Sequence, residues 1–170
     1  MQVKRQDGAL VLALYPSTTG LAFVLFESPL SIIDWGKTSE HGRHKNDICV
    51  AFVKRLIDRY SPDVIVLENY QAKDTRRSIR VKLLNRSLHV LATVNNIEVI
   101  RFRQMDVRLT FAKIGAKTKY DRSRVIASML PALSHRLPPV RKAWMSEDSR
   151  MALFEAAALG LTYYGESKGE

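Results

Sequence analysis

Apolar residues gather in short runs along the first part of the chain, and residues that favour turns close each run. The first run covers residues 9–15 and ends in the polar turn 16–20. The second covers residues 21–27, is broken by Ser28-Pro29, and is followed by a third at 30–36. Short runs separated by tight turns predict three strands that pair as an antiparallel meander.

The pattern then alternates between helical spacing and continuous apolar stretches. Apolar residues recur at helical spacing between Ile48 and Ile57, and this helix is expected to end before Ser61-Pro62. Apolar stretches at 62–68 and 97–102 predict strands in a parallel, fully covered part of a sheet. Further helices are expected at residues 78–94, 105–112, 121–133 (capped by Asp121) and 146–164. This order predicts a mixed α/β sheet flanked by helices.

Length and composition narrow the class of protein. The chain has 170 residues, which suits a single domain over residues 1–170. Its single cysteine, Cys49, excludes a disulfide within one chain and a zinc site built from several cysteines. The longest apolar run is far shorter than the about 20 residues that a membrane helix needs, and no charged-then-apolar leader opens the chain. We therefore expect a cytoplasmic protein without a membrane partner.

The charge indicates a polyanionic partner. Lysine and arginine number 27 against 17 acidic residues, which gives a net charge of +10 and a pI near 9.9. Such an excess is typical of proteins that bind nucleic acid and, less often, an anionic membrane. The basic residues also cluster in a few segments, at 76–86, 101–108, 113–124 and 136–142.

Glu68 is the sharpest candidate for chemistry. It ends the apolar stretch at 62–68, and open α/β sheets place their sites at the carboxyl ends of their strands. A carboxylate there is partly desolvated and suited to holding a divalent metal ion. It could equally be a strand-end charge that turns into water, and the residues alone leave both interpretations open.

Five segments together resemble the RuvC-type Holliday junction resolvases of the ribonuclease-H-like superfamily, over nearly the whole chain. They are residues 12–20 (LALYPSTTG), 64–70 (VIVLENY), 97–108, 115–125 and 154–161 (FEAAALGL). The resemblance implies a ribonuclease-H-like fold. Its mixed five-stranded sheet would combine a three-stranded antiparallel meander with parallel strands. It also implies Mg²⁺ or Mn²⁺ as cofactor if the chain is active, four-way DNA junctions as partner, and a homodimer.

The sequence departs from this family where the family binds its metals. The resemblance places metal ligands at positions 15, 68, 152 and 155, but only Glu68 and Glu155 are acidic here. A phenol such as Tyr15 is a poor magnesium ligand, and Ala152 offers no ligand atom. Tyr15 is then best interpreted as filling the vacated pocket, with its hydroxyl bonded to Glu68 or water. Stacking on a base or contact with a phosphate is its alternative.

Asp148 could replace a missing ligand. If the last helix already includes it, Asp148 shares a face with positions 152 and 155, with Glu147 in reserve beside it. The competing interpretation, which we favour, is that these acidic residues stabilise the start of the helix by charge.

The resemblance also implies a DNA-binding surface. Arg108 and Arg122 match basic positions near the scissile phosphate of similar resolvases, and Tyr70 matches an aromatic that stacks on an unpaired base. The candidate nucleic-acid-binding residues are Tyr70, Arg76, Arg77, Arg80, Arg108, Lys117, Lys119 and Arg122.

The resemblance implies two alternative functions. The first is a RuvC-like protein that binds branched or structured DNA with weak or no nuclease activity. The second is an active metal-dependent endonuclease that uses Glu68, Asp148 and Glu155 as catalytic and metal-binding residues. A third, an interaction module unrelated to nucleic acid, would need the charge only for solubility. The segment 78–94 is a candidate dimer face, although its apolar stripe could equally belong to the core.

Overall fold

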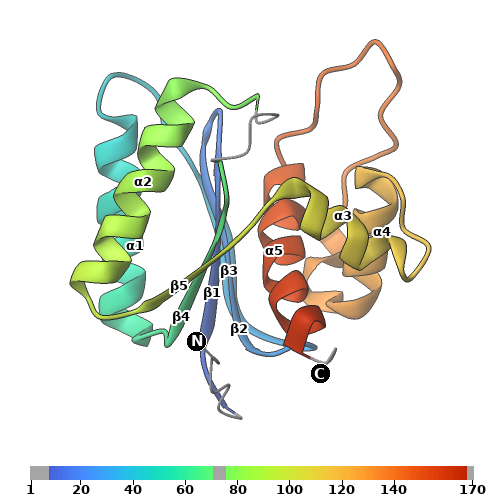
Figure 1. Cartoon of the computed structure of the whole chain (residues 1–170). Coiled ribbons are helices and arrows are strands. Elements are labelled where there is room, and N and C mark those ends of the chain that lie inside the picture. Colours follow the sequence, from blue (N-terminus) through green and yellow to red (C-terminus); the bar gives the residue numbers. More distant parts are fainter. Residues whose placement is uncertain (1–7, 71–75, 168–170) are drawn as a thin grey trace.

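The computed structural model of the protein describes residues 8–70 and 76–167, which form one mixed sheet with helices on both faces (Figure 1). The strand order is β3-β2-β1-β4-β5. Pairing is antiparallel from β3 to β1 and parallel from β1 through β4 to β5. The predicted meander joined to parallel strands is therefore confirmed. The strands are β1 (Val11–Ser17), β2 (Gly20–Ser28), β3 (Ser31–Ser39), β4 (Val64–Glu68) and β5 (Glu98–Phe102).

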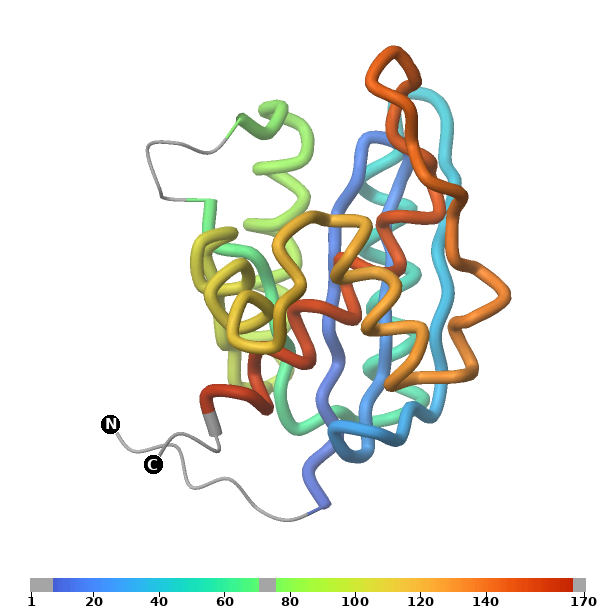
Figure 2. Tube along the Cα trace, turned by 90° about the vertical axis from the view of Figure 1, so that its right-hand side faces the viewer, coloured from blue at the N-terminus to red at the C-terminus, as the bar shows by residue number. Residues whose placement is uncertain are grey.

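Two layers of helices cover the sheet (Figures 1 and 2). The first layer is α1 (Lys45–Tyr60) and α2 (Ile79–Val94). The second consists of α3 (Gln104–Ala112), α4 (Lys119–Met129), the short 3-10 helix η1 (Pro131–Arg136) and α5 (Met151–Ser167). Among the described residues, no helix is both long and apolar enough to cross a membrane.

The central strands are apolar on both sides because each side faces a helical layer. Leu12 and Leu14 pack in the cluster beneath α1 and α2, whereas Val11, Ala13 and Tyr15 pack in the cluster beneath α5. Successive residues of a strand point to opposite faces, so this alternation is the expected one. It places Tyr15 on the face of β1 that α5 covers.

The last helix begins later than the sequence predicts. The expected start at residue 146 is wrong, because α5 begins at Met151. Asp148 sits in the turn before it, where its carboxylate accepts a hydrogen bond from the Arg150 backbone N–H at 2.9 Å. A side-chain acceptor of this kind stabilises a chain that is entering a helix.

The boundaries of α4 also differ from expectation. Thr118, and not Asp121, caps the helix: its hydroxyl accepts from the Asp121 N–H at 3.0 Å, and the Asp121 carboxylate accepts from the Thr118 N–H at 3.2 Å. This reciprocal pair is a capping box. The helix ends at Met129, because Pro131 lacks an N–H group and restricts the residue before it.

Candidate functional site

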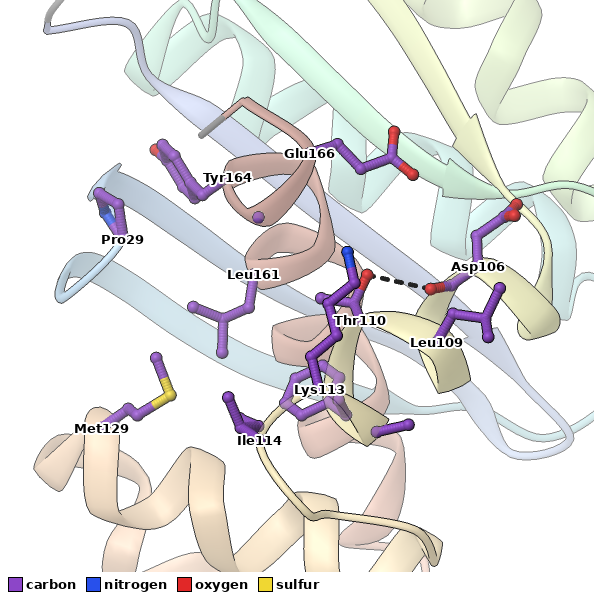
Figure 3. A pocket seen from close by; sticks show the side chains of 13 residues that line it. Pro29, Asp106, Leu109, Thr110, Lys113, Ile114, Met129, Leu161, Tyr164 and Glu166 are labelled. Atoms are coloured by element: carbon purple, nitrogen blue, oxygen red, sulfur yellow. Dashed lines mark hydrogen bonds between the residues drawn. The ribbon is translucent and has the colours of Figure 1, made fainter. Parts of the chain in front are cut away.

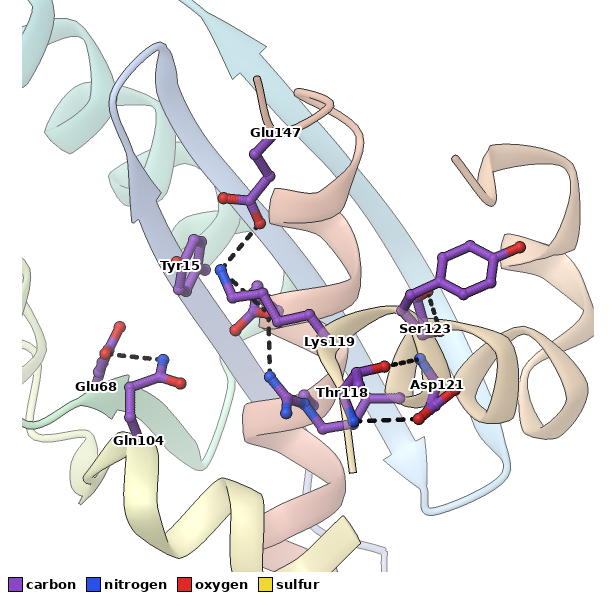
Figure 4. Close-up of polar contacts among 12 residues, drawn as sticks. Tyr15, Glu68, Gln104, Thr118, Lys119, Asp121, Ser123 and Glu147 are labelled. Atoms are coloured by element: carbon purple, nitrogen blue, oxygen red, sulfur yellow. Dashed lines mark hydrogen bonds and ion pairs between the residues drawn. The ribbon is translucent and has the colours of Figure 1, made fainter. Parts of the chain in front are cut away.

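Three side chains meet where β1 and β4 end and α5 begins. Tyr15 comes from β1, Glu68 is the last residue of β4, and Glu155 lies near the start of α5. All three are buried, and Glu68 is only 2% exposed. Figure 4 shows Tyr15 and Glu68 on one side of this site and Lys119 and Glu147 on the other. The fold thus brings together three of the four positions that the resemblance singled out.

Glu68 is fully engaged by neighbouring donors. Its Oε2 accepts a hydrogen bond from Arg77 Nη2 at 3.1 Å, and its Oε1 accepts one from Gln104 Nε2 at 2.9 Å. Its backbone carbonyl accepts from Asn85 Nδ2 at 3.0 Å. A buried carboxylate needs such partners, since an unpaired buried charge is strongly unfavourable.

Arg77 lies between two tyrosine rings. Its guanidinium carbon is 4.9 Å from the centre of the Tyr15 ring and 5.9 Å from that of Tyr70, and its Nη2 also donates to the Tyr15 hydroxyl. Aromatic faces attract cations, so the two rings and Glu68 form a cage for a positive charge. We call Arg77, Tyr15, Tyr70 and Glu68 the arginine cage.

At neutral pH, Arg77 is charged and Tyr15 is neutral, although Arg77 itself lowers the pKa of Tyr15. Burial lowers the pKa of Arg77, but its attraction to Tyr15 and Glu68 outweighs burial and leaves the pKa raised. Burial, helped by repulsion from Glu155, raises the pKa of the Tyr15 hydroxyl well above its usual range. Burial likewise raises the pKa of Tyr70. The phenol of Tyr15 is therefore not a source of negative charge at neutral pH.

Glu155 has its own cationic partners. Its Oε1 lies 3.6 Å from Arg122 Nη2 and 3.9 Å from Lys119 Nζ, and Lys119 Nζ also lies 2.9 Å from Oε1 of Glu147. Arg122 is buried with only 4% exposure, whereas the Lys119 side chain is 43% exposed. The site therefore holds as many cations as carboxylates. The carboxylates are Glu68, Glu147 and Glu155, and the cations are Arg77, Lys119 and Arg122.

The donors present do not fit a pair of divalent ions. No group of three or more His, Cys, Asp or Glu side chains in the described parts of the chain is arranged to hold a metal. Glu68 and Glu155 already face cations, Tyr15 is a neutral phenol, and Ala152 has no ligand atom. A two-metal site needs ligands that hold ions about 3.5–4 Å apart.

Asp148 does not supply the missing ligand from a shared helix face, because it lies outside α5. Its carboxylate binds the Arg150 guanidinium in a fork, at 2.9 Å to Nε and 2.7 Å to Nη2. Hydrogen bonding to Arg150 lowers the pKa of Asp148 to about 2. The metal-binding role of Asp148 depended on its being part of the last helix, and the structure does not place it there.

The other candidate DNA-binding residues fall into two groups. Arg80 is half-buried and has partners within the protein, since it donates to the carbonyl oxygens of Ser17 and Thr18 at 2.7 and 3.1 Å and to Asn46 at 2.9 Å. The exposed group comprises Arg76, Arg108 and Lys117.

Gln104 and Asn85 are site residues that sequence patterns did not single out. A weak signal existed for each. Asn85 interrupts the buried stripe of α2, and Gln104 is the first residue of the helix after β5, the strand next to β4. A polar residue in a buried stripe usually has a specific partner.

A cavity of about 720 Å³ lies toward the other end of α5 (Figure 3). Leu109, Ile114, Leu161 and Tyr164 line it. Burial raises the pKa of the Tyr164 hydroxyl to about 12. The lining is mostly apolar, so this cavity is separate in place and in chemistry from the arginine cage.

Known proteins resemble the chain in structure. No protein-family model and no curated protein matches it. RuvC of Thermus thermophilus matches with a TM-score of 0.67 and 16% identity, over 94% of this chain and 95% of that one. The same enzyme in complex with a Holliday junction substrate gives 0.66 and 16% over the same shares. A yeast mitochondrial Holliday junction resolvase gives 0.61 and 14%, over 94% and 80%. The predicted RuvC-type, ribonuclease-H-like fold is confirmed.

Proposed function

We propose that this protein binds branched DNA such as four-way junctions and does not cut it at a useful rate. Two findings support DNA as the partner. The fold is shared with RuvC, one structure of which contains a Holliday junction substrate, and the chain carries a net charge of +10. Basic proteins of this size attract the phosphate backbone first, and base or shape recognition follows.

The arginine cage is the observation that carries the second half of the proposal. A divalent ion at Glu68 would meet the guanidinium of Arg77, which already binds Oε2 at 3.1 Å. Metal-assisted phosphoryl transfer needs the ion to polarise the phosphate and activate water. With the Arg77 guanidinium bound to Glu68, the described part of the site offers cations to a phosphate but lacks the cluster of carboxylates that would hold a metal ion to activate water.

Individual residues have distinct parts in this proposal. Lys119 lies at the mouth of the site and is the exposed cation closest to Glu155, so it is suited to contact a phosphate. The side chain of Arg77 is 26% exposed, so its outer edge can contact the same DNA strand as Lys119. Arg122 is buried and balances Glu155, which makes it a positioning residue. The exposed Arg76, Arg108 and Lys117 extend the basic surface.

A homodimer through α2 is part of the proposal. The structure divides the apolar residues of α2 between two faces: Leu84 and Leu88 are buried, whereas Ile79, Leu83, Val90 and Val94 are 53–78% exposed. The exposed residues lie near one another on the outer side of the helix, and such a stripe favours a second protein surface. The distinguishing measurement is the mass in solution of the protein and of its Leu83→Glu variant.

The decisive experiment compares binding and nicking of a four-way junction in EDTA, in magnesium and in manganese. We expect the same affinity in all three and no nicking. A triple variant restores two acidic residues and removes the guanidinium; its changes are Tyr15→Asp, Ala152→Asp and Arg77→Ala. Manganese-dependent nicking by this variant, and not by the starting protein, would support a cleavage site that has been lost.

Other outcomes reject the proposal. Robust cutting by the starting protein that Glu68→Ala abolishes would establish the active endonuclease. An affinity that does not change with salt would remove nucleic acid as the partner and leave the interaction module.

A further inference from the structure

The aromatic residue expected to stack on DNA is turned into the protein. Tyr70 packs against Arg77, and its hydroxyl oxygen is buried. The neighbouring sequence QAKDT contains no other aromatic residue. Among the described residues, Trp144 is the one aromatic side chain that is largely exposed, at 80%. A different aromatic residue is therefore available to DNA.

Trp144 lies on a long connection beside the candidate site. Residues 137–150 link η1 to α5 and project beyond the end of the sheet at which β1 and β4 finish, as both views show (Figures 1 and 2). Two contacts fix the C-terminal part of this connection: Lys119 Nζ to Glu147 at 2.9 Å, and Lys37 Nζ to the Ser149 carbonyl at 3.2 Å. Because Lys119 also faces Glu155, the connection forms one side of the site.

The surroundings of Trp144 combine apolar and cationic groups. Lys142 Nζ lies 5.8 Å from the centre of its ring, and Arg141 precedes Lys142 in the chain. Val140 is 66% exposed and Met145 is 39% exposed on the same connection. Proteins that bind unpaired nucleotides pair an aromatic platform for the base with cations for the backbone. Charge complementarity thus favours nucleic acid over an apolar protein surface as the occupant.

We propose that Trp144 stacks on an unpaired base at the branch point of the DNA, with Lys142 and Arg141 on the adjoining phosphates. This inference rests on the proposed function, because it names the part of the DNA that the protein recognises. It predicts a preference for branched or bulged DNA over fully paired duplex, since a paired and stacked base exposes no face to the indole.

The fluorescence of Trp144 provides the test. The chain contains two tryptophans, so Trp35→Phe leaves Trp144 as the only reporter. A four-way junction and a duplex with a single bulged base should quench its emission and protect it from acrylamide, whereas a fully paired duplex should not. In the reverse variant, Trp144→Phe, the emission of Trp35 should stay unchanged on binding.

Affinities complete the experiment. Trp144→Ala should weaken junction binding by about 10-fold or more, and Trp144→Phe should retain most of it, because a phenyl ring still stacks. Binding to paired duplex should stay unchanged in both variants. Lys142→Ala is the matched control, and it should weaken binding to junction and duplex alike.

Each contrary result has a separate meaning. If junctions bind with strong salt dependence but Trp144→Ala binds as well as the parent, the stacking inference is wrong and the proposed function stands. If no DNA binds, the proposed function itself is wrong. Protection of Trp144 that depends on protein concentration without DNA would assign it to a contact between copies and overturn the inference.

Discussion

Arg77 joins side chains that the sequence distributes over three segments. Glu68 ends β4, Tyr15 belongs to β1, and Arg77 lies just before Ser78, the N-cap of α2. The strand pattern identified Glu68, and the resemblance drew attention to Tyr15, where the resolvases carry an acidic residue. Sequence patterns grouped Arg77 with neighbouring surface cations, because a charge cluster does not reveal which member turns inward. That choice depends on tertiary contacts between distant residues.

Removing Arg77 should leave the charge of Glu68 without its cation. In Arg77→Met, Glu68 stays buried and keeps its hydrogen bond from Gln104 but loses its ion pair, and we expect a loss of about 1–3 kcal/mol in the free energy of unfolding. Glu68→Gln in the same chain should recover part of the loss, since no unpaired charge remains. Urea denaturation of the two single variants and the double variant measures the coupling. Additive effects would contradict the ion pair.

The pH dependence of the free energy of unfolding should show the ionisation of the Tyr15 hydroxyl. Because its pKa is raised in the folded state, the folded protein holds the phenolic proton more tightly than the unfolded chain. The resulting stability is fully present below about pH 10 and is lost as the pH rises above it. Tyr15→Phe should cost about 1 kcal/mol at neutral pH but lose stability less steeply above about pH 10. Urea denaturation across that range tests this, and parallel curves would contradict it.

At the scale of elements, the sequence predicted every strand and the order of the main helices, because periodicity reports which faces are buried. Helix ends were predicted less well. The start of α5 was placed at residue 146 instead of Met151, and the cap of α4 was placed at Asp121 instead of Thr118. Both errors occur where a side-chain hydrogen bond to the backbone decides between turn and helix. Hydrophobic spacing carries no information about such bonds.

Gly160 shows how closely α5 approaches the sheet. A Cβ atom at this position would collide with the ring of Phe26, which is completely buried on β2. Alanine normally stabilises a helix interior by about 1 kcal/mol relative to glycine. We nevertheless expect Gly160→Ala to destabilise the protein by about 1–3 kcal/mol, because the core would be overpacked.

Thermal or urea denaturation measures this loss. Phe26→Leu in the same chain should reduce the penalty of Gly160→Ala by removing the colliding ring atoms. Gly165→Ala is the matched control, since its Cβ would meet only a Thr110 methyl group at 3.1 Å. Equal losses at positions 160 and 165 would contradict the explanation.

At the scale of the whole molecule, the net charge of +10 should control affinity for DNA. We expect the logarithm of the junction binding constant to fall with the logarithm of salt concentration with a slope of about −3 to −6, as when several phosphates are neutralised. Arg108→Ala should make the slope less steep by about one unit. Arg55→Ala, on α1, is the matched control. An equal effect of both variants would place the DNA surface elsewhere.

The position of α5 also determines how the chain must fold. This helix packs against all five strands and supplies much of the core on its side of the sheet, yet it follows every strand in the sequence. During synthesis, β1 therefore emerges long before the helix that covers it. Closing such a long loop costs entropy before contacts are gained, which slows folding. Until α5 has been synthesised, Val11, Ala13 and Val24 lack the helix that covers them in the folded protein.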